Sequence, residues 1–539
     1  MGGGTNSYRE IEETEVILLW GSNARETHPI FFHHLLKGVH NGAKLFAIDP
    51  RRTSSVRWAD SWIGLDVGTD IVVANAMGRE IIAQGWHDRT FIDHATTGFD
   101  DYWRSVESFT LEEAERLSGV PASSIHGMAR AYATAKRAMI CWTLGITEHH
   151  NGVDNVSSLI NLALLTGHVG RFGSGLNPLR GQNNVQGGGD MGALPDRFPG
   201  FQHVEVEANR LKFESAWNTR LPVKRGWNLT GMLEAMGRGD LTALIILGEN
   251  PLQSEADRLH TEGLLRKLDF LVVQDLVLTP TAELAHVVLP AATGWCESDG
   301  TVTNSERRVQ RVRKALNPPG EARDDAQILH DLARAMGHDW GPFNSKQTWD
   351  ELRALSPVHS GISYERLEQG AGLQWPCYDE AHPGEMFLHS RLWEQPLNGP
   401  KVVFQTVRHS PPVEPLTAEF PLRLTTGRRL SDYNTGVQTG GFDSPLRRGE
   451  TLDLSPEDAA SLGVVDGETV RVVSPRGAIE APVRLSNGLR PGLVFMTFHF
   501  QDKVNTNILT IDATDPRSGT AEFKACSIRV EKMAATHRD

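Results

Sequence analysis

Cysteine is scarce in this chain of 539 residues, which contains Cys141, Cys296, Cys377 and Cys526 and no others. No two of them form a CxxC pair, so the sequence offers no recognisable zinc or iron–sulfur site, and such sparse thiols are typical of a reducing compartment. No apolar run approaches the roughly 20 residues of a membrane-spanning helix. The start, MGGGTNSYREIEETE, lacks the basic and apolar regions of a signal peptide. We therefore expect a cytoplasmic protein without a membrane span.

An excess of positive charge is also missing. Lys and Arg number 54 against 67 Asp and Glu, which gives a formal net charge of −13. This balance argues against a general nucleic-acid partner, although it is compatible with local basic pockets for small anions. The hydrophobic content of 39% is ordinary for a globular protein, and the length predicts roughly three or four domains.

Alternating strands and helices indicate an α/β fold. Residues 15–21 and 43–50 are expected to be buried strands joined by a helix, which makes a βαβ unit with a parallel sheet. The alternation continues with a helix over 70–84, a strand over 137–146 and a helix over 154–170. A second unit has strands at 241–251 and 269–275, with a helix over 254–268 that Ser254 caps.

In the C-terminal part, short strands replace the alternation of strands and helices. From Phe420 onward, strands are expected at 421–427, 468–486 and 492–498, with a hairpin turn at SPRG and a short capped helix within 454–464. This pattern indicates a terminal β-barrel, whereas 302–411 is mixed. We predict a first α/β cofactor domain at 1–182, a second at 183–297, a connecting region at 298–410 and the barrel at 411–539.

Polar residues follow the strands of both α/β units. In parallel sheets, ligands bind beyond the carboxyl ends of the strands. Asp49 is placed to accept from ribose hydroxyls or a base edge, and Arg51 to pair with a phosphate. Each such stretch alone could be an ordinary turn, but two units with the same pattern favour a ligand. No GxGxxG motif is present, so an NAD-type site is not indicated. An unrelated α/β nucleotide-binding transferase is the other class to weigh, yet the turns carry neither a phosphate loop nor a catalytic base.

Two histidine pairs and one glycine-rich stretch stand apart from these elements. His33–His34 and His149–His150 lack metal-site spacing, and neighbouring side chains point in different directions, so we expect packing roles. Cys141 lies within an apolar strand and is expected to be inert. Residues 177–195, NPLRGQNNVQGGGDMGALP, have neither helical nor strand periodicity. Their amides and glycines predict a loop around a ligand.

This stretch resembles a signature of molybdopterin-dependent formate dehydrogenases, in the bis-molybdopterin guanine dinucleotide (dimethyl sulfoxide reductase) superfamily. Segments in family order along the whole chain share the resemblance: LLWGSNARETHP, AKLFAIDPRRT, GITEHHNGVDNVSSLINLALLTGHVGRFGSG, ILGENPLQSEA, VVQDLVLTPTAELAHVVLPAATGWCESDGTVTNSERRVQ, TTGRRLSDYNTG and NILTIDATDP. The resemblance implies two related three-layer α/β domains, each holding one pterin dinucleotide, and a double-psi barrel that closes over a cofactor containing molybdenum or tungsten.

The resemblance also assigns cofactor-binding residues. The first α/β domain would contribute Gly21, Ser22, Asn23, His28, Asp49, Arg51, Gly68, Asp70, Gly145 and Thr147. The second would contribute Gly248, Glu249, Asn250, Gln274 and Asp275. The barrel would contribute Thr426, Gly427, Arg428, Tyr433, Asn434, His499, Asn507 and Lys524.

Arg180 is the residue that the resemblance places at the substrate. A guanidinium offers a planar fork to a carboxylate and stays charged at working pH. Formate, the smallest carboxylate, could be oriented by Arg180 so that its C–H faces the metal. Gln182 would complete this anion site. The alternative is that Arg180 clamps a cofactor phosphate.

The chain departs from the family pattern at one end. Relatives of this kind place an iron–sulfur domain, and then a Cys or selenocysteine followed by His, ahead of the segment that matches Thr5–Asn6–Ser7. No cysteine here aligns with that metal ligand, and ligands for a 4Fe-4S cluster are not present. Three explanations of this departure compete. The chain is a fragment that is inactive alone, half of a split enzyme with a companion chain, or a non-catalytic pterin-binding protein. We favour the fragment. Electron-transfer subunits would be partners of the complete enzyme.

Overall fold

The computed structural model describes residues 2–294, 296–436, 449–500 and 503–533. Its contacts divide the chain into two compact units. We call them the barrel unit (Thr5–Leu179, Gln253–His260 and Phe387–Asp539) and the insert unit (Met1–Gly4, Arg180–Leu252 and Thr261–Met386). The four predicted domain ranges divide the chain differently and stay predictions.

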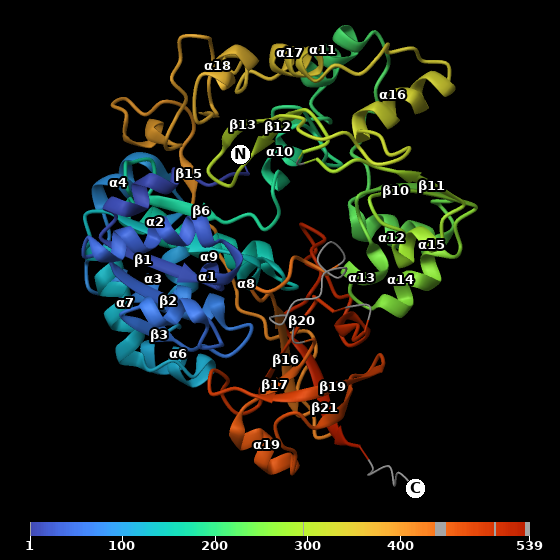
Figure 1. Ribbon diagram of the computed structural model, residues 1–539. Coiled ribbons are helices and arrows are strands. Elements are labelled where there is room, and N and C mark those ends of the chain that lie inside the picture. Colours follow the sequence, from blue (N-terminus) through green and yellow to red (C-terminus); the bar gives the residue numbers. More distant parts are fainter. Residues whose placement is uncertain (1, 295, 437–448, 501–502, 534–539) are drawn as a thin grey trace, which may run out of the picture. The chain divides into compact units, whose positions relative to one another are not determined.

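A five-stranded parallel sheet organises the first part of the barrel unit (Figure 1). Its strand order is β3-β2-β1-β5-β6, from β1 (Val16–Trp20), β2 (Lys44–Ile48), β3 (Ser61–Ile63), β5 (Ala138–Trp142) and β6 (Gly175–Pro178). Strand β1 pairs with β2 on one side and with β5 on the other, so the strand order reverses at β1 and β5. In open sheets of this kind, ligands bind beyond the carboxyl ends of the strands at that point.

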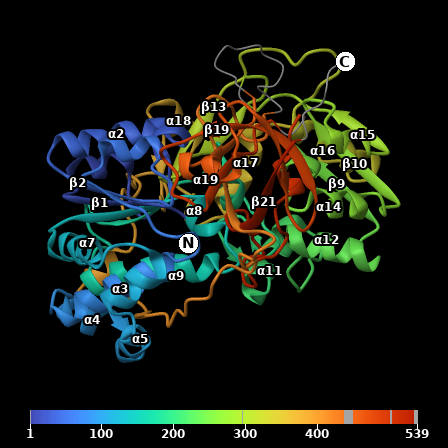
Figure 2. The same cartoon turned by 90° about the horizontal axis from the view of Figure 1, so that it is seen from below.

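Helices cover both faces of this sheet, as Figure 2 shows. Helix α2 (Pro29–His40) packs Phe31 and Leu35 against one face, in a cluster with Ile17 and Leu19 of β1. Helices α3 (Asp70–Ala83), α7 (Ala122–Thr134) and α9 (Gly152–Thr166) pack on the other face, in a cluster with Leu18. Alternate residues of a strand face opposite sides, so β1 is buried on both and its near-continuous apolar run follows from its position.

The end of the barrel unit is a closed barrel of six strands in mixed orientation. Its order is β16-β20-β17-β19-β18-β21, from β16 (Leu422–Gly427), β17 (Leu452–Leu454), β18 (Thr469–Val473), β19 (Ala478–Leu485), β20 (Leu493–Thr497) and β21 (Cys526–Lys532). Ser474 N–H donates to Gly477 O at 2.9 Å in the SPRG turn. The predicted short helix is α19 (Pro456–Leu462), and Ser455 Oγ accepts from Asp458 N–H as its cap. The predicted α/β class with parallel sheets and a terminal barrel is confirmed.

A smaller parallel sheet lies in the insert unit. It comprises β9 (Ala243–Leu247), β10 (Phe270–Asp275) and β11 (Val287–Pro290), in the order β11-β10-β9. One face of this sheet is buried against α12 (Leu229–Arg238), whose Met236 packs in a cluster with Ile246 and Val273. On the opposite face, Ile245 and Leu247 are 45% and 44% exposed. An antiparallel sheet of β12 (Gly300–Thr303), β13 (Arg308–Val312) and β14 (Leu373–Gln374) follows.

Two local predictions were wrong. The helix expected over 254–268 is α14 (Arg258–Leu265), and Ser254 belongs to the preceding α13 (Pro251–Ser254). Asp257, at φ 46°, separates the two helices, and its Oδ1 accepts from His260 N–H at 3.2 Å. The glycine-rich stretch, expected to be irregular throughout, contains a short helix, α10 (Val185–Asp190).

The remaining elements complete the two units. In the barrel unit they are η1 (Tyr8–Glu13), α1 (Ala24–Thr27), η2 (Ser54–Trp58), α4 (Arg89–Ala95), β4 (Thr96–Thr97), α5 (Phe99–Val106), α6 (Leu111–Ser118), α8 (Leu144–Thr147), η3 (Ser390–Trp393), β15 (Val402–Val403) and η4 (Thr506–Ile508). In the insert unit they are β7 (Arg197–Phe198), β8 (Gln202–His203), α11 (Glu207–Trp217), α15 (Pro280–Glu283), α16 (Asp325–Ala335), α17 (Ser345–Leu355) and α18 (Tyr364–Glu368).

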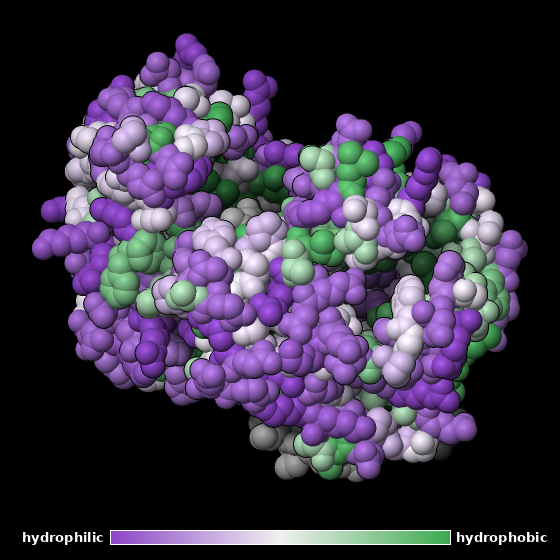
Figure 3. Space-filling model, turned by 90° about the horizontal axis from the view of Figure 1, so that it is seen from above, coloured by the Kyte–Doolittle hydropathy of each residue, from purple (hydrophilic) through white to green (hydrophobic). Residues whose placement is uncertain are grey.

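The face drawn in Figure 3 is mostly hydrophilic, with small hydrophobic patches between polar groups. Among the helices of the described residues, none is both long and apolar enough to cross a bilayer.

Candidate functional site

The ends of β1 and β5 come together at two glycines. Gly21 has φ 55°, and a Cβ added to it would lie 2.8 Å from the carbonyl carbon of Gly145. A Cβ added to Gly145 would in turn lie 2.6 Å from Gly21 O, which accepts from Gly145 N–H at 3.2 Å. The two backbones therefore touch where the strand order reverses, and a side chain at either position would separate them.

Beside this contact, Ser22 fits a ligand-binding role. Its side chain is buried, at 3% exposure, and within the part of the chain that the structure describes its hydroxyl has no hydrogen-bond partner. The Thr53 hydroxyl, which follows β2, has the same property. Buried hydroxyls are normally hydrogen-bonded. Both hydroxyls are thus available to a polar ligand at the carboxyl edge of the sheet, as a bound dinucleotide requires.

Three other predicted residues near these strands form bonds within the protein. Asn23 Oδ1 accepts from the Ser54 hydroxyl at 3.0 Å, and Asp70 Oδ1 accepts from Trp20 Nε1 at 2.8 Å. Burial raises the pKa of Asp70. His28 Nδ1 lies 2.8 Å from Thr27 Oγ1. These contacts hold the loops in place.

Two more predicted positions lie where the backbone is closely packed. Gly68 has φ 85°, and a Cβ there would lie 2.8 Å from Pro412 Cγ. Thr147 ends α8, and its carbonyl leaves no room for a side chain at Gly152.

Asp49 and Arg51 follow β2 as a linked pair. Asp49 Oδ1 accepts from Arg51 N–H at 2.9 Å, and the guanidinium carbon of Arg51 lies 3.7 Å from the ring centre of Phe495 in β20. Burial raises the pKa of Asp49 and lowers the pKa of Arg51. Gly427 allows this stacking, because a Cβ there would lie 2.9 Å from the Phe495 ring. A desolvated cation therefore lies against the barrel.

Lys524 adds a second buried cation. Its Nζ lies 2.6 Å from Glu148 Oε2 and donates to Thr426 O at 3.1 Å. Burial lowers the pKa of Lys524; Glu148 opposes this lowering, whereas the charges of Arg428 and Arg51 add to it. Burial also lowers the pKa of Arg428. Three buried cations thus lie close enough for the two arginines to act on Lys524, and an anion such as a diphosphate would stabilise such a group.

His499 is held as a neutral imidazole. Its Nδ1 lies 2.6 Å from Asn434 O and its Nε2 lies 2.8 Å from Arg429 N. Because the carbonyl accepts and the amide donates, the proton is on Nδ1. Burial lowers the pKa of His499 to about 4. Asn434 also accepts from Arg428 Nη2 at 3.0 Å within the segment after β16, and the two bonds of His499 tie that segment to the one after β20.

The other predicted barrel residues differ in exposure. Tyr433 is 40% exposed. Asn507 is fully buried and donates through Nδ2 to Gln253 O at 3.0 Å. Thr426 donates through its hydroxyl to Phe523 O at 2.8 Å.

A buried ion-pair cluster beside these residues escaped sequence reasoning. His149 Nδ1 lies 3.2 Å from Glu522 Oε1, and His150 Nδ1 lies 3.2 Å from Glu522 Oε2. The adjacent histidines were expected to point in different directions and to pack, but both converge on one carboxylate, 372 residues from His150. Glu148, Glu522 and Phe495 were all missed. The polar run TEHH was a signal for Glu148, whereas nothing local marks Glu522 or Phe495.

In the insert unit, five predicted residues follow β9 and β10. Gly248 has φ 63° and has open space beside it, and its N–H donates to Gln274 O at 2.8 Å. Asn250 Oδ1 accepts from the Thr281 hydroxyl at 2.7 Å. Gln274 Nε2 donates to Asp325 Oδ1 at 2.5 Å. Glu249 and Asp275 accept through their carboxylates from the N–H groups of the residues after them.

Arg180 is half-buried in the insert unit. Its N–H donates to Ser305 Oγ at 2.8 Å, its Nε donates to Gln186 Oε1 at 3.2 Å, and its Nη2 donates to Gly2 O. Burial lowers the pKa of Arg180, and the charge of Asp190 opposes this. Gln182 is exposed, and its carbonyl accepts from Val185 N–H. The roles of all these residues stay predictions.

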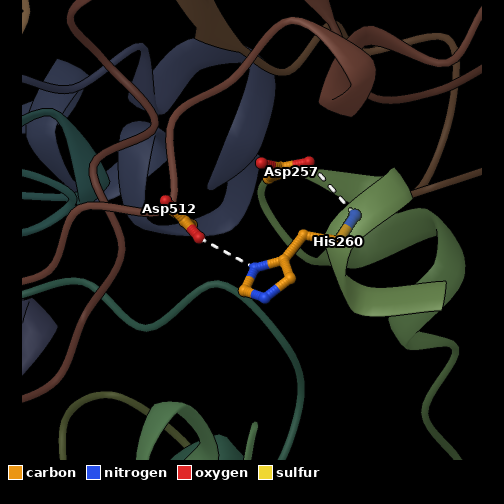
Figure 4. A group of neighbouring side chains, drawn as sticks. All are labelled: Asp257, His260 and Asp512. Carbon is orange, nitrogen blue, oxygen red and sulfur yellow. Dashed lines mark hydrogen bonds and ion pairs between the residues drawn. The ribbon is translucent and has the colours of Figure 1, made fainter. Parts of the chain in front are cut away.

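One surface group of the barrel unit has potential metal ligands. Figure 4 shows Asp257, His260 and Asp512, whose ligand atoms all lie within 4.8 Å of one another. His260 Nδ1 lies 3.1 Å from Asp512 Oδ2, and Asp257 accepts from the His260 backbone. Because these bonds already account for the arrangement, it carries no further assignment.

Two family profiles match the chain. One, described as molybdopterin oxidoreductase, matches residues 3–335, and the other, described as molydopterin dinucleotide binding domain, matches residues 422–527. A solved structure, acetylene hydratase from Pelobacter acetylenicus, has a TM-score of 0.74 at 20% identity, covering 98% of this chain and 81% of that one. At that identity, the likeness concerns the fold alone.

Three curated relatives show similarity along the whole chain. F420-dependent formate dehydrogenase 2 subunit alpha of Methanococcus maripaludis is 44% identical, over 99% of this chain and 78% of that protein. Formate dehydrogenase H of Escherichia coli is 37% identical, over 99% and 75%. The assimilatory nitrate reductase catalytic subunit of Bacillus subtilis is 34% identical, over 98% and 76%.

Proposed function

We propose, because this chain belongs to the molybdopterin oxidoreductase family, that it acts in a formate dehydrogenase, where formate is oxidised to CO2, a proton is released and two electrons pass to an acceptor. The identity of 44% and 37% to two formate dehydrogenases supports this choice. The nitrate reductase relative, at 34%, makes reduction of another oxyanion the competing assignment.

The cofactor would be bis-molybdopterin guanine dinucleotide with molybdenum or tungsten, which supplies the two-electron redox chemistry when bound. Gly21 and Gly145, whose backbones touch each other, would fix the end of β1 beside the cofactor, and the Ser22 hydroxyl would donate to it. Lys524 and Arg428 would neutralise the diphosphate of one dinucleotide. Gly248, Asn250 and Gln274 would hold the other.

Arg180 would bind the substrate. The single observation that supports this role is a half-buried guanidinium held by Gln186 and Gly2, because a desolvated and oriented cation binds a small carboxylate more strongly than an exposed one. Arg180 would direct the C–H of formate toward the cofactor. Gln182 would add a hydrogen bond to the second side of the anion.

Metal and nucleotide analysis tests the cofactor assignment. The chain, expressed in a host replete in molybdenum and tungsten, is expected to contain one of these metals and guanine nucleotide. Absence of both would refute the assignment. Turnover is assayed with formate and a dye acceptor, both in the chain as printed and in a form extended at its N-terminus by a family segment with the Cys–His pair. We expect activity in the extended form and none in the chain of 539 residues alone.

Arg180→Lys tests the substrate assignment in the extended form. Lysine keeps the charge but loses the planar fork, so we expect kcat/KM for formate to fall by at least about tenfold. Arg210→Lys is the matched control, because Arg210 pairs with Glu214 on helix α11 of the same unit. If Arg180→Lys behaved like the control, Arg180 would not bind the substrate. Retained cofactor without any formate turnover would favour a non-catalytic pterin-binding protein.

A further inference from the structure

Arg180 is connected to a buried carboxylate through one amide. Its Nε donates to Gln186 Oε1 at 3.2 Å, and Gln186 Nε2 donates to Asp190 Oδ1 at 2.8 Å. Gln186 is 2% exposed and Asp190 is fully buried. The two lie four residues apart on helix α10, a spacing that places both side chains on one face.

The charge of Asp190 fixes the orientation of the amide. A carboxylate accepts hydrogen bonds and cannot donate them, so the NH2 group of Gln186 must face Asp190. The carbonyl oxygen of Gln186 then faces the opposite way and accepts from Arg180 Nε. With the amide reversed, an NH2 group would face the guanidinium, and donors would oppose donors.

Asp190 is itself held firmly. Its Oδ2 accepts from Trp375 Nε1 at 2.7 Å and lies 3.9 Å from His359 Nε2. The Ser356 hydroxyl lies 2.7 Å from His359 Nδ1, which fixes that ring. All these residues are buried.

One glycine of the stretch, Gly187, serves the same arrangement. Asn184 Oδ1 accepts from Thr303 N–H at 3.0 Å and so ties the start of α10 to β12. A Cβ at Gly187 would collide with this Asn184 side chain. Gly187 therefore lets α10 approach β12 closely enough for Gln186 and Asp190 to turn inward.

We propose that Asp190 is a positioning residue for the substrate, which acts through Gln186 to hold the Arg180 guanidinium in the orientation that binds formate. This inference rests on the proposed function, since it needs Arg180 at the substrate. It adds that the anion affinity of Arg180 depends on a carboxylate that does not touch the substrate.

Asp190→Asn is the first test, made in the extended, metal-loaded form. Asparagine can accept from Trp375, but its NH2 group then faces Gln186 and favours the reversed amide. We expect KM for formate to rise about tenfold, the usual loss when a hydrogen bond to a charged group is removed. Nitrate, a planar oxyanion, serves as a probe of the same site. Its dissociation constant, measured by calorimetry for the binding that formate displaces, should rise similarly. Unchanged KM and unchanged nitrate affinity would overturn the proposal.

A swap of the two side chains separates positioning from folding. In the double variant Asp190→Asn with Gln186→Glu, the introduced amide donates to the introduced carboxylate, which accepts from Arg180 Nε again. We expect this double variant to recover most of the formate KM and nitrate affinity, whereas Gln186→Glu alone, which sets two carboxylates against each other, should impair both. Glu214→Gln, which alters a paired carboxylate on α11, is the matched control and should leave both constants unchanged. If the swap restored the thermal midpoint but not the affinities, the positioning role through Gln186 would be refuted.

A double-mutant cycle with Arg180→Lys distinguishes the substrate role of Arg180 from the positioning role of Asp190. If Asp190 acts through Arg180, adding Asp190→Asn to Arg180→Lys should weaken nitrate binding by less than about twofold. Additive losses would overturn the positioning role and leave the substrate role of Arg180 intact. If Arg180→Lys alone changed neither constant, the proposed function of Arg180 would fail first.

Discussion

Gly145 contacts Gly21 so closely that a Cβ on Gly145 would lie 2.6 Å from the Gly21 carbonyl oxygen. The Thr143 hydroxyl donates to the same oxygen at 2.7 Å, so this carbonyl accepts from both N–H and O–H groups of the segment after β5. The contact joins the carboxyl ends of two neighbouring strands. It fixes the position of the buried Ser22 hydroxyl beside it.

Gly145→Ala should therefore loosen the predicted cofactor site. The added methyl group forces the two backbones apart, and overpacking of this kind typically costs about 1–3 kcal/mol in free energy of unfolding. We expect a lower midpoint in urea and a reduced guanine nucleotide content after purification. Gly127→Ala is the control, because Gly127 lies in helix α7 with open space beside it. That change should stabilise slightly, by roughly 0.5–1 kcal/mol.

The Glu522 cluster should give the stability a characteristic pH dependence. Burial opposes ionisation of Glu522, but the charge of His149 and the hydrogen bonds of both histidines outweigh it and lower the pKa of Glu522. Burial likewise opposes protonation of His149, but Glu522 raises the pKa of His149 above its ordinary 6.5. The stability that comes from the lowered pKa of Glu522 is lost as pH falls below about 4.5. The stability that comes from the raised pKa of His149 is lost as pH rises above about 6.5. The pair should therefore stabilise most between these values.

Glu522→Gln should flatten both limbs of that profile. Removing one partner of a buried ion pair typically costs about 3 kcal/mol in free energy of unfolding. The largest loss is expected at about pH 5.5, midway between the two limbs. Urea unfolding across roughly pH 4 to pH 9 measures it. Glu113→Gln, at an exposed pair with Arg116 on helix α6, should leave the shape of the profile unchanged. An unaltered profile in Glu522→Gln would mean that the pair is already neutral.

The fold was largely predictable because its signals are local. The apolar runs at β1 and β2 reflect a sheet buried on both faces, and the alternation with helices implies parallel strands. Local rules failed where tertiary contacts decide. Helix α10 contains three glycines, each of which disfavours a helix, and it exists because Gln186 and Asp190 bond within the core.

The site was predictable in part for a related reason. Polar residues at strand ends indicated where a ligand would bind, since topology brings those ends to one edge. Partners distant in sequence gave no such signal. Glu522, which is 372 residues from His150, meets both His149 and His150, and Phe495 of β20 stacks on Arg51. Periodicity describes which face a residue occupies and carries no information about which distant side chain it meets.

Lys524→Met should weaken anion binding by the barrel unit. The variant removes a buried cation that lies beside Arg428 and Arg51 and pairs with Glu148. In cofactor-free protein, pyrophosphate at about 100 times its dissociation constant should stabilise the wild type by about 2.7 kcal/mol. We expect little or no pyrophosphate-induced rise of the thermal midpoint in Lys524→Met. Lys532→Met is the matched control, since Lys532 is an exposed lysine of β21 paired with Glu468. An equal rise in both variants would place the anion elsewhere.

The four cysteines should differ sharply in reactivity toward an alkylating reagent. Burial raises the pKa of Cys141 and Cys526 to about 12, and it also raises the pKa of Cys377. Thiolate is the reactive form, so these thiols should stay unmodified in the native protein at about pH 8. Cys296 is only partly buried and should react first. Peptide mass spectrometry after timed exposure to iodoacetamide measures the order, and unfolding in guanidinium should make all four react. Native modification of Cys141 would show that β5 opens to solvent, contrary to its buried place beside β1.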